Sequence, residues 1–243
     1  MIRRLPQVAL WLLGGHAVAF GVFWLLLQVP ESSTPMLAVS LLLAIAPVLI
    51  AAAVNAGAAA AWDLERPFSR GLLAGARRFW SALAAAAVFL AAWMITGALF
   101  EWHAGMRGQM DAAAIARTGS PNTAWVHATI HWVLQFARWT LGLSLAVTLL
   151  GWLVAPGDST ARPAGWRRAA FQPRRWLLIT IWFVLLVALP WSQVYWRPAG
   201  LSLGLETWFV AAKLALIAVL MAVGWSLVLR EGQPPHTVHS ADL

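Results

Sequence analysis

Apolar residues fill the chain in six long runs, and most polar residues lie between them. The runs cover about residues 7–29, 36–62, 80–100, 121–154, 176–195 and 206–229. A helix of about 20 apolar residues spans the hydrocarbon core of a bilayer, and each run reaches about that length. The pattern predicts an all-α fold, a polytopic membrane helical bundle of six transmembrane helices in residues 1–229. Residues 230–243 are polar and are predicted to form a disordered cytoplasmic tail.

The composition agrees with a membrane protein. Of the 243 residues, 61% are hydrophobic and only 11% are charged, and the mean hydropathy is +0.72. A typical soluble domain has about 25% charged residues, so a soluble fold would have too little polar surface. The chain contains no cysteine, which excludes disulfides, thiolate metal sites and cysteine nucleophiles.

The arginines lie mainly on one side of the predicted membrane. The N-terminus, the loops after the second and fourth runs, and the start of the tail are basic, whereas the opposite loops hold only Arg107, Arg117 and Arg197. Cytoplasmic loops carry the excess of Lys and Arg, so both termini are predicted to lie in the cytoplasm of a bacterial inner-membrane protein. The net charge of +8 therefore indicates topology and contact with anionic lipid or a protein partner, not nucleic-acid binding. The predicted contact residues are Arg66, Arg70, Arg77, Arg78, Arg167, Arg168, Arg174 and Arg175.

The two basic loops resemble each other. The first runs from Arg66-Pro67 to Trp80 and the second from Arg162-Pro163 to Trp176, and both lead into an apolar run through a pair of arginines. Two interpretations stay open, a duplicated hairpin in which runs two and three match runs four and five, or coincidence between arginine-rich loops.

The arginine pair before Phe79-Trp80, together with the helix count, also resembles uncharacterised bacterial six-helix proteins similar to the membrane domain attached to some glycerophosphodiester phosphodiesterases. The resemblance covers loop style and helix number only. It implies no catalytic activity, because the chain contains no phosphodiesterase domain.

A polar stripe follows the first half of the fourth run. Thr123, His127, His131, Gln135 and Arg138 recur at spacings of four, four, four and three, which places the last four on one helix face. Charges inside a membrane usually face the protein interior, a partner or water. We therefore expect this face to point inward and Arg138 to pair with a carboxylate. The predicted polar cavity, in the periplasmic half, comprises His127, His131, Gln135, Arg138, Glu101, Glu206 and Lys213.

Other chemistry finds less support. The loop expected over Glu101–Gly119 and the adjoining helix offer possible copper or zinc ligands, namely His103, Met106, Met110, His127 and His131. No carboxylate cluster completes that set, so no metal site is predicted. His16 and His131 lie about 20 Å apart in depth at 1.5 Å per residue, which argues against a shared haem. No activated nucleophile or carboxylate pair is present, so the chain is not predicted to be an enzyme.

The sequence thus predicts a membrane scaffold or accessory subunit without cofactors. Its arginine-rich loops are expected to contact anionic lipid, another membrane protein or a cytoplasmic protein. The alternative is a small permease that uses the polar cavity.

Overall fold

A computed structural model of the chain describes residues 4–29, 33–63, 66–119, 123–155, 171–196 and 202–234. The described part is helical and contains no strand. Its helices are α1 (Leu5–Leu26), α2 (Thr34–Ala60), α3 (Phe68–Ala76), α4 (Phe79–Thr118), α5 (Ala124–Phe136), α6 (Gly142–Val154), α8 (Pro173–Phe183), α9 (Leu189–Ser192) and α10 (Leu203–Glu231). Two π-helical segments, η2 (Ala137–Leu141) and η3 (Val184–Ala188), join α5 to α6 and α8 to α9.

Six continuous helices are long and apolar enough to cross a membrane, as the hydropathy pattern predicts. They are α1, α2, α4, the joined α5–η2–α6, the joined α8–η3–α9, and α10. Proline stands at the start of α1, α2 and α8, where its missing N–H removes no helical hydrogen bond. Large apolar side chains remain exposed on most of the six helices, as lipid-facing side chains would be.

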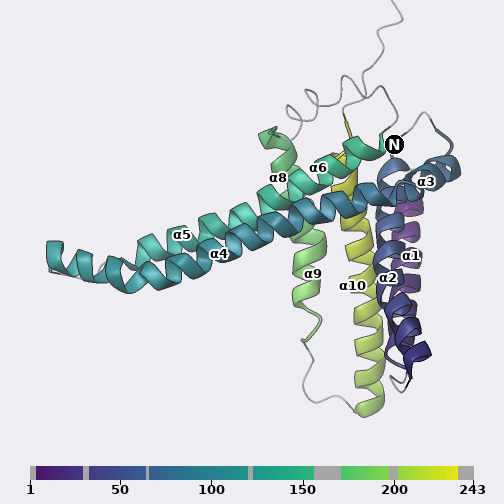
Figure 1. Ribbon diagram of the computed structural model, residues 1–243, viewed down its shortest axis with the longest axis horizontal. Coiled ribbons are helices and arrows are strands. Elements are labelled where there is room, and N and C mark those ends of the chain that lie inside the picture. The colour runs from purple at the N-terminus through teal and green to yellow at the C-terminus, as the bar shows by residue number, and fades with distance from the viewer. Residues whose placement is uncertain are drawn as a thin grey trace, which may run out of the picture.

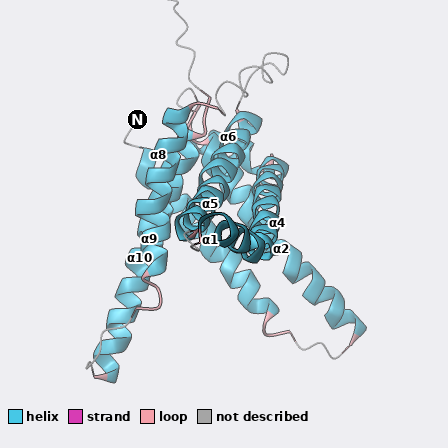
Figure 2. Cartoon of the chain, turned by 90° about the vertical axis from the view of Figure 1, so that its left-hand side faces the viewer, coloured by secondary structure: helices cyan, strands magenta, loops and turns pink. Residues whose placement is uncertain are grey.

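The helices pair into three antiparallel hairpins, α1–α2, α4 with α5–η2–α6, and α8–η3–α9 with α10. The second hairpin is the longest and runs across the other two (Figure 1). Seen along that hairpin, the first and third hairpins both extend downward and splay apart, one to each side (Figure 2). In each hairpin, the first helix begins and the returning helix ends at the same end. We call this end the base of the hairpin.

One predicted loop is wrong. Residues from Glu101 to Thr118 continue α4 as a helix of 40 residues, and the helix ends only at Gly119. This segment is rich in alanine and lacks proline, so nothing in it breaks a helix. Gly119 has φ of 70°, the left-handed conformation that ends helices and that glycine adopts without steric cost.

Small residues let α2 approach its neighbours closely. Ala56, Gly57 and the alanines that follow are buried, and a Cβ on Gly75 of α3 would come within 2.3 Å of the carbonyl oxygen of Ala56. The small residues of α2 therefore allow close packing against α3, a short helix in the first basic loop. The largest fully buried side chains come from α1, α8 and α10, namely Val8, Leu12, Ile179, Val228 and Leu229.

Candidate functional site

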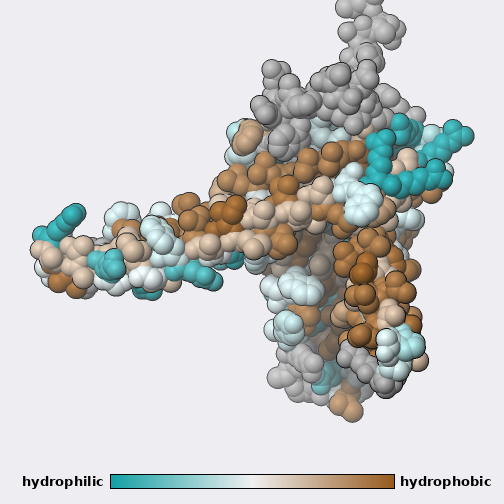
Figure 3. All heavy atoms as spheres, in the orientation of Figure 1, coloured by the Kyte–Doolittle hydropathy of each residue, from teal (hydrophilic) through white to brown (hydrophobic). Residues whose placement is uncertain are grey.

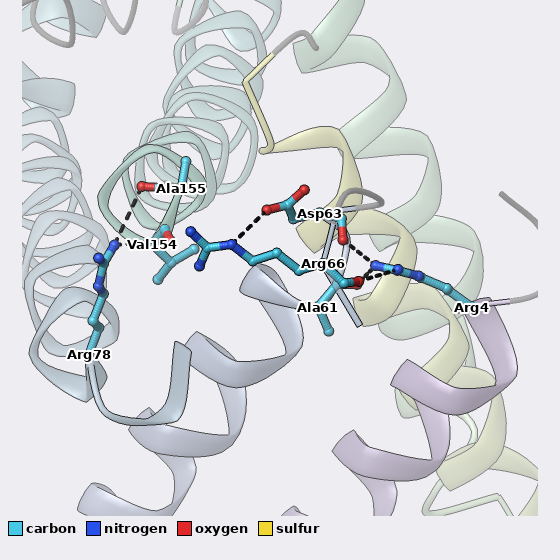
Figure 4. Close-up of polar contacts among 7 residues, drawn as sticks. All are labelled: Arg4, Ala61, Asp63, Arg66, Arg78, Val154 and Ala155. Atoms are coloured by element: carbon cyan, nitrogen blue, oxygen red, sulfur yellow. Dashed lines mark hydrogen bonds and ion pairs between the residues drawn. The ribbon is translucent and has the colours of Figure 1, made fainter. Parts of the chain in front are cut away.

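Each hairpin begins with two adjacent arginines, Arg3-Arg4, Arg77-Arg78 and Arg174-Arg175. The second arginine of the first pair closes the first hairpin. Arg4 donates hydrogen bonds to the carbonyl oxygens of Ala61 at 2.8 Å and Arg66 at 2.6 Å, and also to that of Asp63. The last carbonyls of a helix lack intrahelical partners and carry the negative end of the helix dipole. Arg4 binds the carbonyl of the C-cap residue Ala61 and two carbonyls that follow α2 (Figure 4).

The same arrangement recurs at the other two bases. Arg78 donates to the carbonyl oxygen of Val154 at 3.2 Å, at the end of α6 (Figure 4). Arg175, which is half-buried, donates to the carbonyl oxygen of Gln233 at 2.7 Å, just after α10. Three arginines thus clamp the three returning helices, and we call them the clamp arginines.

The predicted lipid-contact arginines therefore divide into two groups. Arg78 and Arg175 are clamp arginines, and Arg66 forms an ion pair with Asp63 at 3.3 Å. The side chains of Arg70, Arg77 and Arg174 are exposed at the bases, as is that of the clamp arginine Arg78. Arg167 and Arg168 lie outside the described residues, as do Arg162 and Pro163 of the suggested duplication. Hydrophilic side chains gather beside α3 and toward the far end of the long hairpin, whereas apolar side chains cover much of the visible face between them (Figure 3).

The polar stripe of the fourth run faces α4. His127 is 8% exposed, and its Nδ1 lies 3.1 Å from Nε2 of His103. Its Nε2 donates to Asp111 at 2.9 Å, and the hydroxyl of Thr123 donates to the same carboxylate. These contacts join α4 to α5 near the far end of the long hairpin. His131 lies one turn further along, with its ring 5.3 Å from that of Phe100.

Among the described residues, no carboxylate forms an ion pair with Arg138. Its Nε donates to the hydroxyl of Thr96 at 3.0 Å, and its guanidinium carbon lies 4.2 Å from the ring centroid of Trp93 and 5.0 Å from that of Phe100. The predicted inward orientation holds for His127 and Arg138, which contact α4, whereas His131 is exposed. The predicted ion pair is wrong, because aromatic rings and a hydroxyl surround the cation instead. Gln135 is half-buried one turn before Arg138.

The other members of the predicted cavity lie elsewhere. Glu101 is exposed on α4. Lys213 of α10 donates to the carbonyl oxygens of Gln193 and Val194, the latter at 2.9 Å, and to that of Trp196. It therefore closes the end of α9, and Glu206 lies nearly two turns before it on α10. Within the described ranges, the seven residues do not line one cavity.

The histidines of the long hairpin are poorly arranged for a shared metal ion. His103 and Asp111 contact opposite ring nitrogens of His127, so one ion cannot take all three as ligands. Among the residues that the structure describes, no group of three or more His, Asp or Glu could hold a metal ion. Met106 and Met110 are half-buried on α4.

A cavity that the sequence did not predict opens where α1, α2, α4 and α6 meet. Its volume is about 730 Å³ and its walls are almost entirely apolar. The polar side chains at its wall are His16 of α1, Asn55 of α2 and the indole N–H groups of two tryptophans, Trp139 and Trp225. The available signal was the presence of His16 and Asn55 in two adjacent runs that are otherwise apolar.

Six apolar helices of spanning length, closed in pairs by arginines, indicate the class of multi-pass helical membrane proteins. Beyond this class, no family model, curated protein or solved structure matches the chain. The resemblance to the membrane domains of glycerophosphodiester phosphodiesterases therefore stays a prediction.

Proposed function

We propose that this protein is a non-enzymatic inner-membrane scaffold or accessory subunit, with both termini in the cytoplasm, whose basic end binds anionic lipid headgroups. Two exposed arginines that are not clamp arginines, Arg77 and Arg174, carry this proposal. Their neighbours Arg78, which is exposed as well, and Arg175, which is half-buried, bind carbonyl groups of the returning helices.

The exposed arginines suit a surface of anionic lipid. An arginine near such a surface contributes about 1 kcal/mol to binding. Arg70 of α3 adds another exposed guanidinium next to the second hairpin's base. Since Arg78 and Arg175 are held by carbonyl groups, Arg70, Arg77 and Arg174 are the arginines that provide the lipid contact.

A charge-matched pair of double variants tests the proposal. Arg77→Gln with Arg174→Gln removes two charges from the bases, whereas Arg107→Gln with Arg117→Gln removes two exposed charges from the far half of α4. Binding of phosphatidylglycerol to the detergent-purified protein is measured by native mass spectrometry. The first double variant should bind about fivefold more weakly for each arginine removed, at about 1 kcal/mol each, and the second should bind as the parent does. Equal effects of the two variants would overturn the proposal.

The permease alternative rests on a polar cavity. The residues expected to form it are divided between the long hairpin and the third hairpin in the part of the chain that is described, so no observation favours a permease.

A further inference from the structure

We propose that the cavity between α1, α2, α4 and α6 binds one neutral, mainly apolar molecule whose hydroxyl group donates a hydrogen bond to Nε2 of His16. This site is separate from the arginines at the bases. The proposal rests on a chain of hydrogen bonds that fixes the tautomer of His16 and on the apolar, uncharged lining of the cavity.

The chain begins at Trp225, whose indole N–H can only donate. It donates to Oδ1 of Asn55 at 2.6 Å, so the amide nitrogen of Asn55 points the other way. That nitrogen donates to the carbonyl oxygen of Ala51 at 2.8 Å and lies 3.4 Å from Nε2 of His16. Since an amide N–H₂ group is a donor only, Nε2 of His16 must be the acceptor.

The other ring nitrogen leads to the same tautomer. Nδ1 of His16 lies 2.8 Å from the carbonyl oxygen of Leu12, which can only accept, so Nδ1 carries the hydrogen. Nε2 is then a lone-pair acceptor at the cavity wall. Its donor among the described residues is the amide nitrogen of Asn55, and the distance of 3.4 Å between the two nitrogens exceeds the usual range of about 2.7–3.2 Å. An under-satisfied acceptor among apolar side chains favours a ligand that supplies a hydrogen-bond donor.

The residues that line the cavity determine the chemistry of the rest of the ligand. None of the described residues that line the cavity is an aspartate, glutamate, lysine or arginine, so a charged headgroup would lose its hydration without gaining a counter-ion. The volume of about 730 Å³ lies in the usual range for small-molecule sites, about 300–1,000 Å³. His16 lies about 15 Å from either end of α1 at 1.5 Å per residue. A phospholipid, whose polar group stays at the interface, would not bring that group to this depth.

The test uses two photoactivatable probes that differ only in the donor, a diazirine-bearing hexadecanol and its methyl ether. The full-length protein in mild detergent is labelled with each probe, with unlabelled hexadecanol as competitor, and the labelled peptides are identified by mass spectrometry. We expect labelling of α1 and α2 at the cavity. The ether should bind about fivefold more weakly, which corresponds to one hydrogen bond of about 1 kcal/mol.

Three variants make the test specific. His16→Phe keeps a ring but removes the acceptor, and it should abolish the difference between the probes. Ala86→Phe fills the cavity and should reduce labelling by both probes. Ala87→Phe is the matched control, because Ala87 is exposed on α4 and does not line the cavity. Equal binding of alcohol and ether by the parent would show a site for any acyl chain, and undiminished labelling of Ala86→Phe would place the probes outside the cavity. Either result overturns the proposal.

Discussion

The guanidinium of Arg78 lies 3.2 Å from the carbonyl oxygen of Val154, a residue 76 positions further along the chain. This contact joins the first residue before α4 to the last residue of α6. Arg4 and Arg175 make equivalent contacts with carbonyl groups of residues 57 and 58 positions further along the chain. The arginine clamp is therefore a repeated feature of this fold. The longer separation in the second hairpin reflects the helical extension of α4 beyond Glu101.

Replacing a clamp arginine should destabilise the protein more than replacing its neighbour. Arg175→Gln removes a half-buried, charge-assisted hydrogen bond to Gln233, and such bonds contribute about 1.5–3 kcal/mol. Arg174→Gln removes an exposed charge and should change stability by less than about 0.5 kcal/mol. Thermal unfolding in detergent distinguishes the two variants. Equal melting temperatures would contradict a clamping role for Arg175.

The predicted topology can be tested by cysteine labelling, because the chain contains no natural cysteine. Single cysteines at Ser33 and Ser202, which precede α2 and α10, should react with a membrane-impermeant thiol reagent applied from the periplasm. A cysteine at Ser69 of α3 should be protected in intact cells and react after lysis. Labelling of Ser69 from outside would reverse the arrangement inferred from the arginines.

Arg138 should tolerate an apolar replacement of similar length. Arg138→Met leaves no buried carboxylate behind, since the partners of Arg138 are Thr96, the carbonyl oxygen of Trp93 and two aromatic rings. The loss should be about 1–2 kcal/mol, as for a cation–π contact and a hydrogen bond. Breaking a buried ion pair would cost about 3–5 kcal/mol. Thermal unfolding of the variant decides between these values, and a loss in the higher range would indicate a carboxylate partner.

The contacts of Asp111 should hold the far part of the long hairpin together. Asp111→Asn replaces the carboxylate that accepts hydrogen bonds from both His127 and Thr123. Amide hydrogen exchange should therefore become faster in α5 and unchanged in α1 and α2. Glu101→Gln, at an exposed carboxylate on the same helix, is the matched control. Identical exchange in the two variants would show that Asp111 does not secure the hairpin.

Hydropathy was sufficient to predict six helices, because each apolar run is long enough to require helical hydrogen bonding inside a membrane. It could not show that α4 continues past Glu101, since hydropathy marks where an apolar run ends and not where a helix ends. The spacing of His127 and Arg138 identified their common face. It could not identify the neighbour, because periodicity defines a direction on one helix and says nothing about which helix packs there.

The arginines show the same limit of sequence reasoning. Arg77-Arg78 and Arg174-Arg175 were explained by topology and by contact with lipid or a partner, and both explanations treat the two members of each pair alike. Only the pairing of the helices reveals that the second member reaches the carbonyl groups of the returning helix. The suggested duplication matched runs two and three with runs four and five. In the structure, the repeated unit is instead a hairpin such as α4 to α6, and Arg78 and Arg175 occupy equivalent places in two such hairpins. The Arg-Pro part of the suggested duplication stays a prediction.

The arginine clamps also define an order of biogenesis. Each clamp arginine is synthesised before the carbonyl groups that it binds, by 57, 76 and 58 residues. A nascent chain therefore cannot close a hairpin until its returning helix has left the ribosome. Once Ala61 has emerged, the first hairpin contains both sides of its clamp and can close before α4 is made. Membrane insertion would then proceed in pairs of helices, and a ribosome stalled between the members of a pair would leave an arginine without its carbonyl partners.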